Sequence, residues 1–215
     1  WPQYAEDFYV PLEEMSIPEI PSDEAFNIIF AGNIGYAQGL DILPKAAEII
    51  KTKSDKKIRF NIVGDGRYKN EFISIVESKE LNEMFNFISK QPATRIPEFM
   101  AASDAAFLSL TDSPLFAMTI PAKLQSYMAC GIPNIASASG ETYKIIKDSN
   151  SGLCGKPGNA EELADNIIEL SKKTKQELKE LGNNARKYYE ENFDKQALLD
   201  RMDSYFGSRA VLGGN

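Results

Sequence analysis

Lys123 is the side chain of this sequence with the clearest potential for binding chemistry. The surrounding segment, 119–133, reads TIPAKLQSYMACGIP. Pro121 is typical of the first turn of a helix, and a glycine followed by a proline is typical of its end. Residues of a helix turn by about 100° each, so Thr119, Lys123 and Ser126 share one stripe. A lysine beside the positive end of a helix dipole is favourable where it meets an anion, so we expect a phosphate there. A solvated lysine is the alternative.

Two glycine-rich turns follow predicted strands and could also approach a ligand closely. The first is AGNIGYAQGL (31–40), with Gly32, Gly35 and Gly39, and the second is VGDG (63–66). Glycines let a backbone come close to a ligand, and the amides of a following helix attract phosphate. A plain tight turn is the competing interpretation. Neither turn has the GxGxxG pattern of dinucleotide binding or the GxxxxGK[ST] pattern of a phosphate loop, which disfavours an NAD-dependent dehydrogenase.

Composition excludes several other kinds of site. The chain has no histidine, which removes imidazole bases, His-dependent triads and most zinc sites. Cys130 and Cys154 lack a CxxC spacing and are interpreted as small buried hydrophobic residues, so no metal is expected. The net charge of -7 disfavours nucleic acid as a partner.

The elements that must position these residues alternate between apolar runs and amphipathic helical patterns. The predicted strands are 26–31, 57–63, 83–88, 104–110, 133–137 and 151–154. Long charged helical stretches follow at 159–171, 174–191 and about 195–206. Continuous apolar strands separated by single helices are typical of a parallel sheet covered on both faces. The sequence therefore predicts an α/β fold, a Rossmann-like doubly wound parallel sheet with extra C-terminal helices, whose ligands bind at the carboxyl ends of the strands.

Four motifs in order carry a resemblance to a known family. They are GNIGYAQGL, VGDG, QPATRIPEFMAASDA (91–105) and PAKLQSYMACGIPNIAS (121–137). Together they resemble the C-terminal domain of a group 1 glycosyltransferase of the GT-B fold, over residues 26 to about 206. The resemblance implies an interdomain linker at 1–25, a Rossmann-like donor-binding domain at 26–192, and a C-terminal crossover helix and tail at 193–215.

The resemblance also implies a site for a nucleotide-diphosphate sugar, commonly linked to UDP. The glycine-rich loop at 32–39 would face the diphosphate, and the stretch around Ser89 to Gln91 would lie against the base through its backbone. The MACGIP helix would present side chains to the ribose and phosphates. The implied residues are Gly32, Asn33, Gly35, Gln38, Ser89, Lys90, Gln91, Thr119, Lys123 and Ser126.

Three positions depart from the family pattern. Asn33 and Gln38 stand where many members carry Arg and Lys, which leaves Lys123 as the candidate for the phosphate charge. Ser126 replaces the glutamate expected to hold the ribose hydroxyls, and Met118 replaces the earlier glutamate of the pair. No catalytic residue is assigned.

The resemblance implies the donor half of a retaining glycosyltransferase in cell-surface polysaccharide or lipid-linked glycan synthesis. The alternative is a non-catalytic nucleotide-binding or partner-binding module. The sequence given begins with Trp1, its first residues lack the basic-then-apolar order of a signal peptide, and it has no run of about 20 apolar residues. We therefore expect part of a longer cytoplasmic protein. Its partner would be the missing N-terminal domain, through which any contact with the inner membrane face would be made. No tightly bound cofactor is expected.

Overall fold

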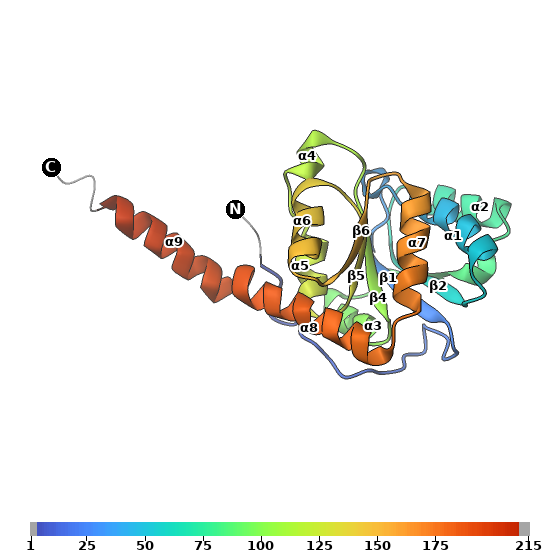
Figure 1. The fold of residues 1–215 in the computed structure, drawn as a ribbon, viewed down its shortest axis with the longest axis horizontal. Coiled ribbons are helices and arrows are strands. Elements are labelled where there is room, and N and C mark those ends of the chain that lie inside the picture. Colours follow the sequence, from blue (N-terminus) through green and yellow to red (C-terminus); the bar gives the residue numbers. More distant parts are fainter. Residues whose placement is uncertain (1–3, 211–215) are drawn as a thin grey trace.

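A six-stranded parallel sheet forms the centre of the molecule, as the sequence predicts (Figure 1). The computed structural model describes residues 4–210, apart from the side chains at 197, 201 and 205–210. The predicted tail at 211–215 therefore lies outside the described residues. The strands, in the spatial order β3-β2-β1-β4-β5-β6, are β1 (Phe26–Asn33), β2 (Ile58–Asp65), β3 (Phe85–Ile88), β4 (Ala105–Ser109), β5 (Asn134–Ser137) and β6 (Gly152–Gly155). The order reverses between β1 and β4, which opens a crevice at their carboxyl ends.

Helices cover both faces of the sheet, because successive strand residues point to opposite sides and both sides are apolar (Figure 1). One face packs against α1 (Ile42–Lys53), α2 (Lys69–Ser78) and α7 (Ala160–Ser171). The other packs against α3 (Ile96–Ala101), α5 (Ala122–Ala129), α6 (Gly140–Asp148) and much of α8 (Lys175–Asn192). In β1, for example, Phe30 belongs to the first core and Ile29 to the second.

Short helical turns and a projecting helix complete the chain. The 3-10 turns are η1 (Tyr36–Gln38), η2 (Asn82–Met84) and η3 (Ala93–Arg95), and α4 (Pro114–Ala117) is a single turn. The strand predicted from residue 83 begins at Phe85 because η2 occupies the residues before it. The last helix, α9 (Lys195–Ala210), continues beyond α8 and leaves the body of the domain (Figure 1).

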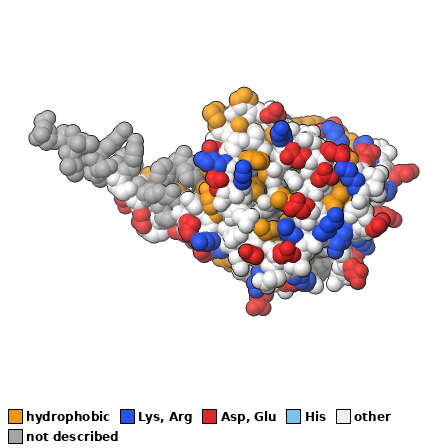
Figure 2. Space-filling model, viewed as in Figure 1, with side chains coloured by type: hydrophobic (Ala, Val, Ile, Leu, Met, Phe, Trp, Pro, Cys, Tyr) orange, Lys and Arg blue, Asp and Glu red, His pale blue; other side chains and the backbone are white. Residues whose placement is uncertain are grey.

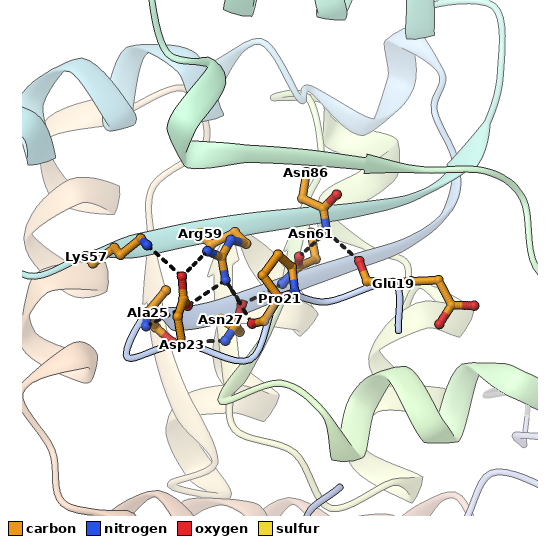
Figure 3. A network of polar contacts seen from close by, with 9 residues as sticks. All are labelled: Glu19, Pro21, Asp23, Ala25, Asn27, Lys57, Arg59, Asn61 and Asn86. Carbon is orange, nitrogen blue, oxygen red and sulfur yellow. Dashed lines mark hydrogen bonds and ion pairs between the residues drawn. The ribbon is translucent and has the colours of Figure 1, made fainter. Parts of the chain in front are cut away.

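The N-terminal segment (residues 4–25) forms no helix or strand, yet it is fixed to the domain. Ile17 and Ile20 are buried in the second core. The guanidinium of Arg59 donates to both carboxylate oxygens of Asp23, at 2.9 and 2.6 Å, and to the Pro21 carbonyl at 3.3 Å (Figure 3). Asn86 Nδ2 donates to the Glu19 carbonyl at 2.8 Å. Polar residues on β2 and β3 thus hold this segment against the sheet.

The visible surface in Figure 2 mixes basic with acidic side chains, and hydrophobic side chains gather at the top, over α4. Leu115 and Met118, in and just after α4, are 62% and 72% exposed. Among the residues described, no helix combines the length and hydrophobicity needed to cross a bilayer.

Candidate functional site

A pocket of about 650 Å³ lies at the carboxyl ends of the central strands. Its walls come from the ends of β1 and β2, the loop after β3, the start of α5 and the N-terminal segment. The lining residues are Glu6, Tyr9, Ala31, Gly32, Asn33, Val63, Gly64, Asp65, Gly66, Lys90, Gln91, Ala93, Ile96, Ala122, Lys123, Ser126 and Tyr127. The pocket therefore occupies the position at which open parallel sheets bind ligands.

Glycines form the floor of the pocket because the backbones of β1 and β2 approach each other closely there. Gly64 has φ +149°, and a Cβ on it would collide with the Gly32 carbonyl. Gly32 has φ +138°, and a Cβ on it would stand 2.7 Å from Lys123 Cε. Side chains other than hydrogen are therefore disfavoured at both positions, so the pocket wall here is backbone, exposed at Gly32 and buried at Gly64.

Lys123 reaches from the first turn of α5 back to the end of β1. Its Nζ donates to Gln38 Oε1 at 2.8 Å and lies 3.7 Å from the centre of the Phe30 ring. Leu124, Tyr127 and Met128, on the neighbouring face of α5, are buried in the second core and fix the helix. The helix ends at Ala129, and Gly131 just beyond it adopts the left-handed conformation with φ +67°, which fits the glycine that the sequence places at the helix end.

Burial lowers the pKa of Lys123 from the ordinary lysine value to about 7. Its two contacts, an amide oxygen and an aromatic face, favour the ammonium form but carry no full negative charge. An anion in the pocket would supply that charge and raise the pKa of Lys123. The arrangement is thus suited to bind an anionic group beside Gly32.

The loop after β3 is held in place by Arg95. Arg95 Nη1 donates to Gln91 Oε1 and to Glu19 Oε1, both at 2.8 Å, and Arg95 Nε donates to Glu98 Oε2 at 3.1 Å. The other end of the Gln91 amide donates to the Ser89 carbonyl at 3.2 Å. Both ends of the Gln91 side chain are therefore engaged within the protein, so this loop can offer a ligand its backbone and the exposed Lys90 side chain.

The structure brings six of the ten sequence-predicted site residues into the pocket wall. These are Gly32, Asn33, Lys90, Gln91, Lys123 and Ser126. The other four, Gly35, Gln38, Ser89 and Thr119, do not line the pocket. Gln38 contacts Lys123 instead. Thr119 precedes α5, and its hydroxyl donates to the Phe116 carbonyl at 3.1 Å, away from the predicted stripe.

Sequence reasoning missed Glu6 and Tyr9, which line the pocket from the N-terminal segment. That segment shows no helical or alternating pattern, so no sequence signal placed it at the site. Asp65 and Gly66 were also not predicted as site residues, although the VGDG turn that contains them was noted.

The described residues contain no cluster of three or more His, Cys, Asp or Glu side chains that could hold a metal ion. Burial raises the pKa of both thiols, Cys130 and Cys154, to about 12. Both are therefore protonated at neutral pH and unreactive.

Comparison with known proteins identifies the family. A model for glycosyl transferases group 1 matches residues 13–188. The chain belongs to the group 1 glycosyltransferases. One curated relative of this group 1 domain is N-acetyl-alpha-D-glucosaminyl L-malate synthase of Bacillus anthracis, 26% identical over 77% of this chain. Another is the amylovoran biosynthesis glycosyltransferase AmsK of Erwinia amylovora, 23% identical over 69% of the chain. The chain spans only 41% and 36% of the lengths of these relatives.

Solved structures support the fold of this group 1 domain as one Rossmann-like part of a GT-B glycosyltransferase. HepE of Anabaena in complex with UDP-glucose matches with a TM-score of 0.70 and 21% identity, over 86% of this chain and 49% of HepE. TarM of S. aureus, in a complex that includes UDP, matches with a TM-score of 0.69 and 17% identity, over 91% of this chain and 38% of TarM.

Proposed function

We propose that this chain is the donor-binding half of a retaining glycosyltransferase that uses a nucleotide-diphosphate sugar, with UDP as the nucleotide. The observation that carries the proposal is the position of Lys123, a half-buried side chain whose ammonium lies beside Gly32 at the carboxyl end of β1. A diphosphate placed there would meet the Lys123 ammonium, the positive end of α5 and the glycine backbone, and Lys90 is a second cation in the pocket lining.

The relatives support UDP as the nucleotide, since HepE was solved with UDP-glucose and TarM with UDP. The retaining course rests on the family resemblance. A role in cell-surface polysaccharide or lipid-linked glycan synthesis is supported by the name of AmsK, an amylovoran biosynthesis enzyme. We place the protein in the cytoplasm, with the N-terminal half of the enzyme as its partner and as the site of any membrane contact.

Titration calorimetry of the folded chain with UDP, ADP and GDP tests the proposal. We expect weak, selective binding, with UDP preferred, because the base would meet the loop at 89–91 while the phosphates meet Lys123. If the folded chain binds none of the three nucleotides, the proposal is contradicted. That result would favour a non-catalytic partner-binding module, the alternative function that the replacement of the family glutamate by Ser126 supports.

A further inference from the structure

The N-terminal segment contributes a carboxylate to the pocket. Glu6 and Tyr9 both line it, and they belong to one tight turn in which the Tyr9 amide donates to the Glu6 carbonyl at 2.9 Å. The neighbouring Ala5 is buried, and its carbonyl accepts from the Tyr189 hydroxyl of α8 at 3.4 Å. The turn is thus anchored to the domain and holds its two side chains at the pocket wall.

Glu6, Tyr9 and Ser126 lie together on one side of the pocket. Burial raises the pKa of the Tyr9 hydroxyl, the negative charge of Glu6 raises it further, and a hydrogen bond with Ser126 acts in the opposite direction. Ser126 lies three residues after Lys123 on α5, a rise of about 4.5 Å along the helix axis. The pocket therefore has a cationic region and, roughly one helical turn away, a region with a carboxylate and two hydroxyls.

A carboxylate in this position repels the phosphates of a nucleotide and accepts hydrogen bonds from its hydroxyls. Two vicinal hydroxyls can donate to the two oxygens of one carboxylate, and such charge-assisted hydrogen bonds are about twice as strong as neutral ones. The pocket's other carboxylate, on Asp65, already accepts from the Gly66 amide at 2.8 Å. Glu6 is exposed, lines the pocket and lies near the Tyr9 hydroxyl, which makes it the carboxylate better placed for this role.

We propose that Glu6 binds the ribose diol of the nucleotide, with the Tyr9 and Ser126 hydroxyls beside it. This inference rests on the proposed function, since it names the residue that reads the ribose in the same pocket. It makes the N-terminal segment part of the binding site as well as a connection between domains. The sugar of the donor also carries vicinal hydroxyls, so the test must separate the two diols.

The test compares UDP with 2′-deoxyuridine 5′-diphosphate by calorimetry on the unchanged chain and on Glu6→Gln. We expect the unchanged chain to prefer UDP by about 10-fold or more, the range for a hydrogen bond to a charged group. Glu6→Gln should reduce this preference to about 2-fold and leave the affinity for the deoxynucleotide nearly unchanged. Glu13→Gln, an exposed glutamate of the same segment outside the pocket lining, is the matched control and should keep the preference.

Three results would overturn the inference while leaving the proposed function intact. One is a Glu6→Gln chain that still prefers UDP as the parent does. Another is a Glu6→Gln chain that loses equal affinity for both nucleotides, which would indicate a general effect on the pocket. The third is a loss of affinity for UDP-glucose without a loss for UDP, which would assign Glu6 to the sugar. A folded, unchanged chain that binds no nucleotide would overturn the proposed function and the inference together.

Discussion

At the scale of the residue, the proposed function depends on Lys123, whose positive charge is unfavourable at its position in the unliganded protein. Lys123 stands in the first turn of α5, where the helix dipole is already positive, and its ammonium is largely removed from water. The Phe30 ring and the Gln38 amide compensate only in part. Residues that are costly in the unliganded protein and favourable with a ligand are typical of binding sites.

Replacement of Lys123 by methionine should separate binding from stability. Lys123→Met is expected to weaken the binding of UDP about 10-fold to 150-fold, the range for one hydrogen bond to a charged group, with little effect on uridine. The unliganded domain should become more stable because a buried charge is removed, raising Tm by about 2 to 4 °C if the gain is about 1 kcal/mol. Calorimetry and thermal unfolding measure the two effects.

The matched control is Lys144→Met, which removes an exposed lysine of α6 outside the pocket lining. It should leave both quantities unchanged. A Lys123→Met chain that binds UDP as well as the parent would mean that the phosphate charge is met elsewhere.

The pKa of Lys123, about 7, predicts a pH dependence of binding. If the ammonium contacts the diphosphate, the affinity for a UDP-sugar should fall as the pH rises above about 7, by at most about 10-fold per pH unit. A UDP-sugar is preferable to UDP because it lacks the terminal phosphate that titrates near pH 6. Calorimetry at pH 6, 7, 8 and 9 gives the profile, and a curve as flat as that of Lys123→Met would refute the assignment.

Lys123 also makes the stability of the unliganded domain depend on pH, in the direction opposite to its effect on ligand affinity. A lysine whose pKa is lowered by folding binds fewer protons in the folded state than in the unfolded state. Its contribution to the stability of the unliganded domain should therefore rise with pH between about 7 and 10.

At the scale of the element, the N-terminal segment connects the sheet to the pocket. Asp23 is held at the sheet by Arg59 (Figure 3), and Glu6 and Tyr9 of the same segment line the pocket. Glu19 accepts from Arg95, which also donates to Gln91 in the pocket wall. Arg59 and Lys57 also hold the pKa of the Asp23 carboxyl well below its usual range. The stability that Asp23 contributes is therefore complete above the unfolded pKa near 4 and is lost as the pH falls below it.

Asp23 forms two ion pairs, one with Arg59 and one with Lys57, and a substitution of each partner compares a buried with an exposed contact. The Arg59 side chain is 8% exposed and that of Lys57 is 58% exposed, and both contact Asp23. Arg59→Met should lower the free energy of unfolding by about 2 to 3 kcal/mol because it removes a buried guanidinium that donates to Asp23 and to the Pro21 carbonyl. Lys57→Met should lower it by at most about 1 kcal/mol, since exposed ion pairs contribute little. Urea unfolding measures both, and equal losses would contradict this account of the segment.

The elements were more predictable from sequence than the site. The six strands follow from apolar runs, and the bounds of α5 follow from Pro121, Gly131 and the apolar spacing between them. The pocket wall formed by Glu6 and Tyr9 could not be predicted, because a segment without periodicity gives no sign of where it packs. Gln38 illustrates a different limit of sequence-based prediction. Its loop follows β1 as expected, but its amide oxygen accepts a hydrogen bond from Lys123 and does not line the pocket, because three-dimensional packing sets this contact.

At the scale of the whole molecule, we propose that the chain supplies one side of a larger enzyme. It spans 41% of its Bacillus relative and 49% of HepE. The helix α9 extends from the body of the domain, and we expect it to contact the N-terminal half (Figure 1).

The chain alone should bind a donor but transfer no sugar. Holding two reactants in the reactive geometry lowers the activation barrier by roughly 7 to 11 kcal/mol. One half of a two-domain site cannot hold both reactants. An assay of sugar transfer and donor hydrolysis with a UDP-sugar should give the buffer rate for this chain. Turnover well above that rate would show that the site is complete without a second half.

A crystal structure of this chain with UDP would show whether a nucleotide diphosphate binds beside Lys123 at the carboxyl end of β1. We expect a phosphate oxygen about 3 Å from Lys123 Nζ, in hydrogen-bond contact, with the diphosphate over the peptide groups of Gly32 and Asn33. UDP bound elsewhere on the domain, or in the pocket with its phosphates away from a Lys123 still hydrogen-bonded to Gln38, would contradict this expectation.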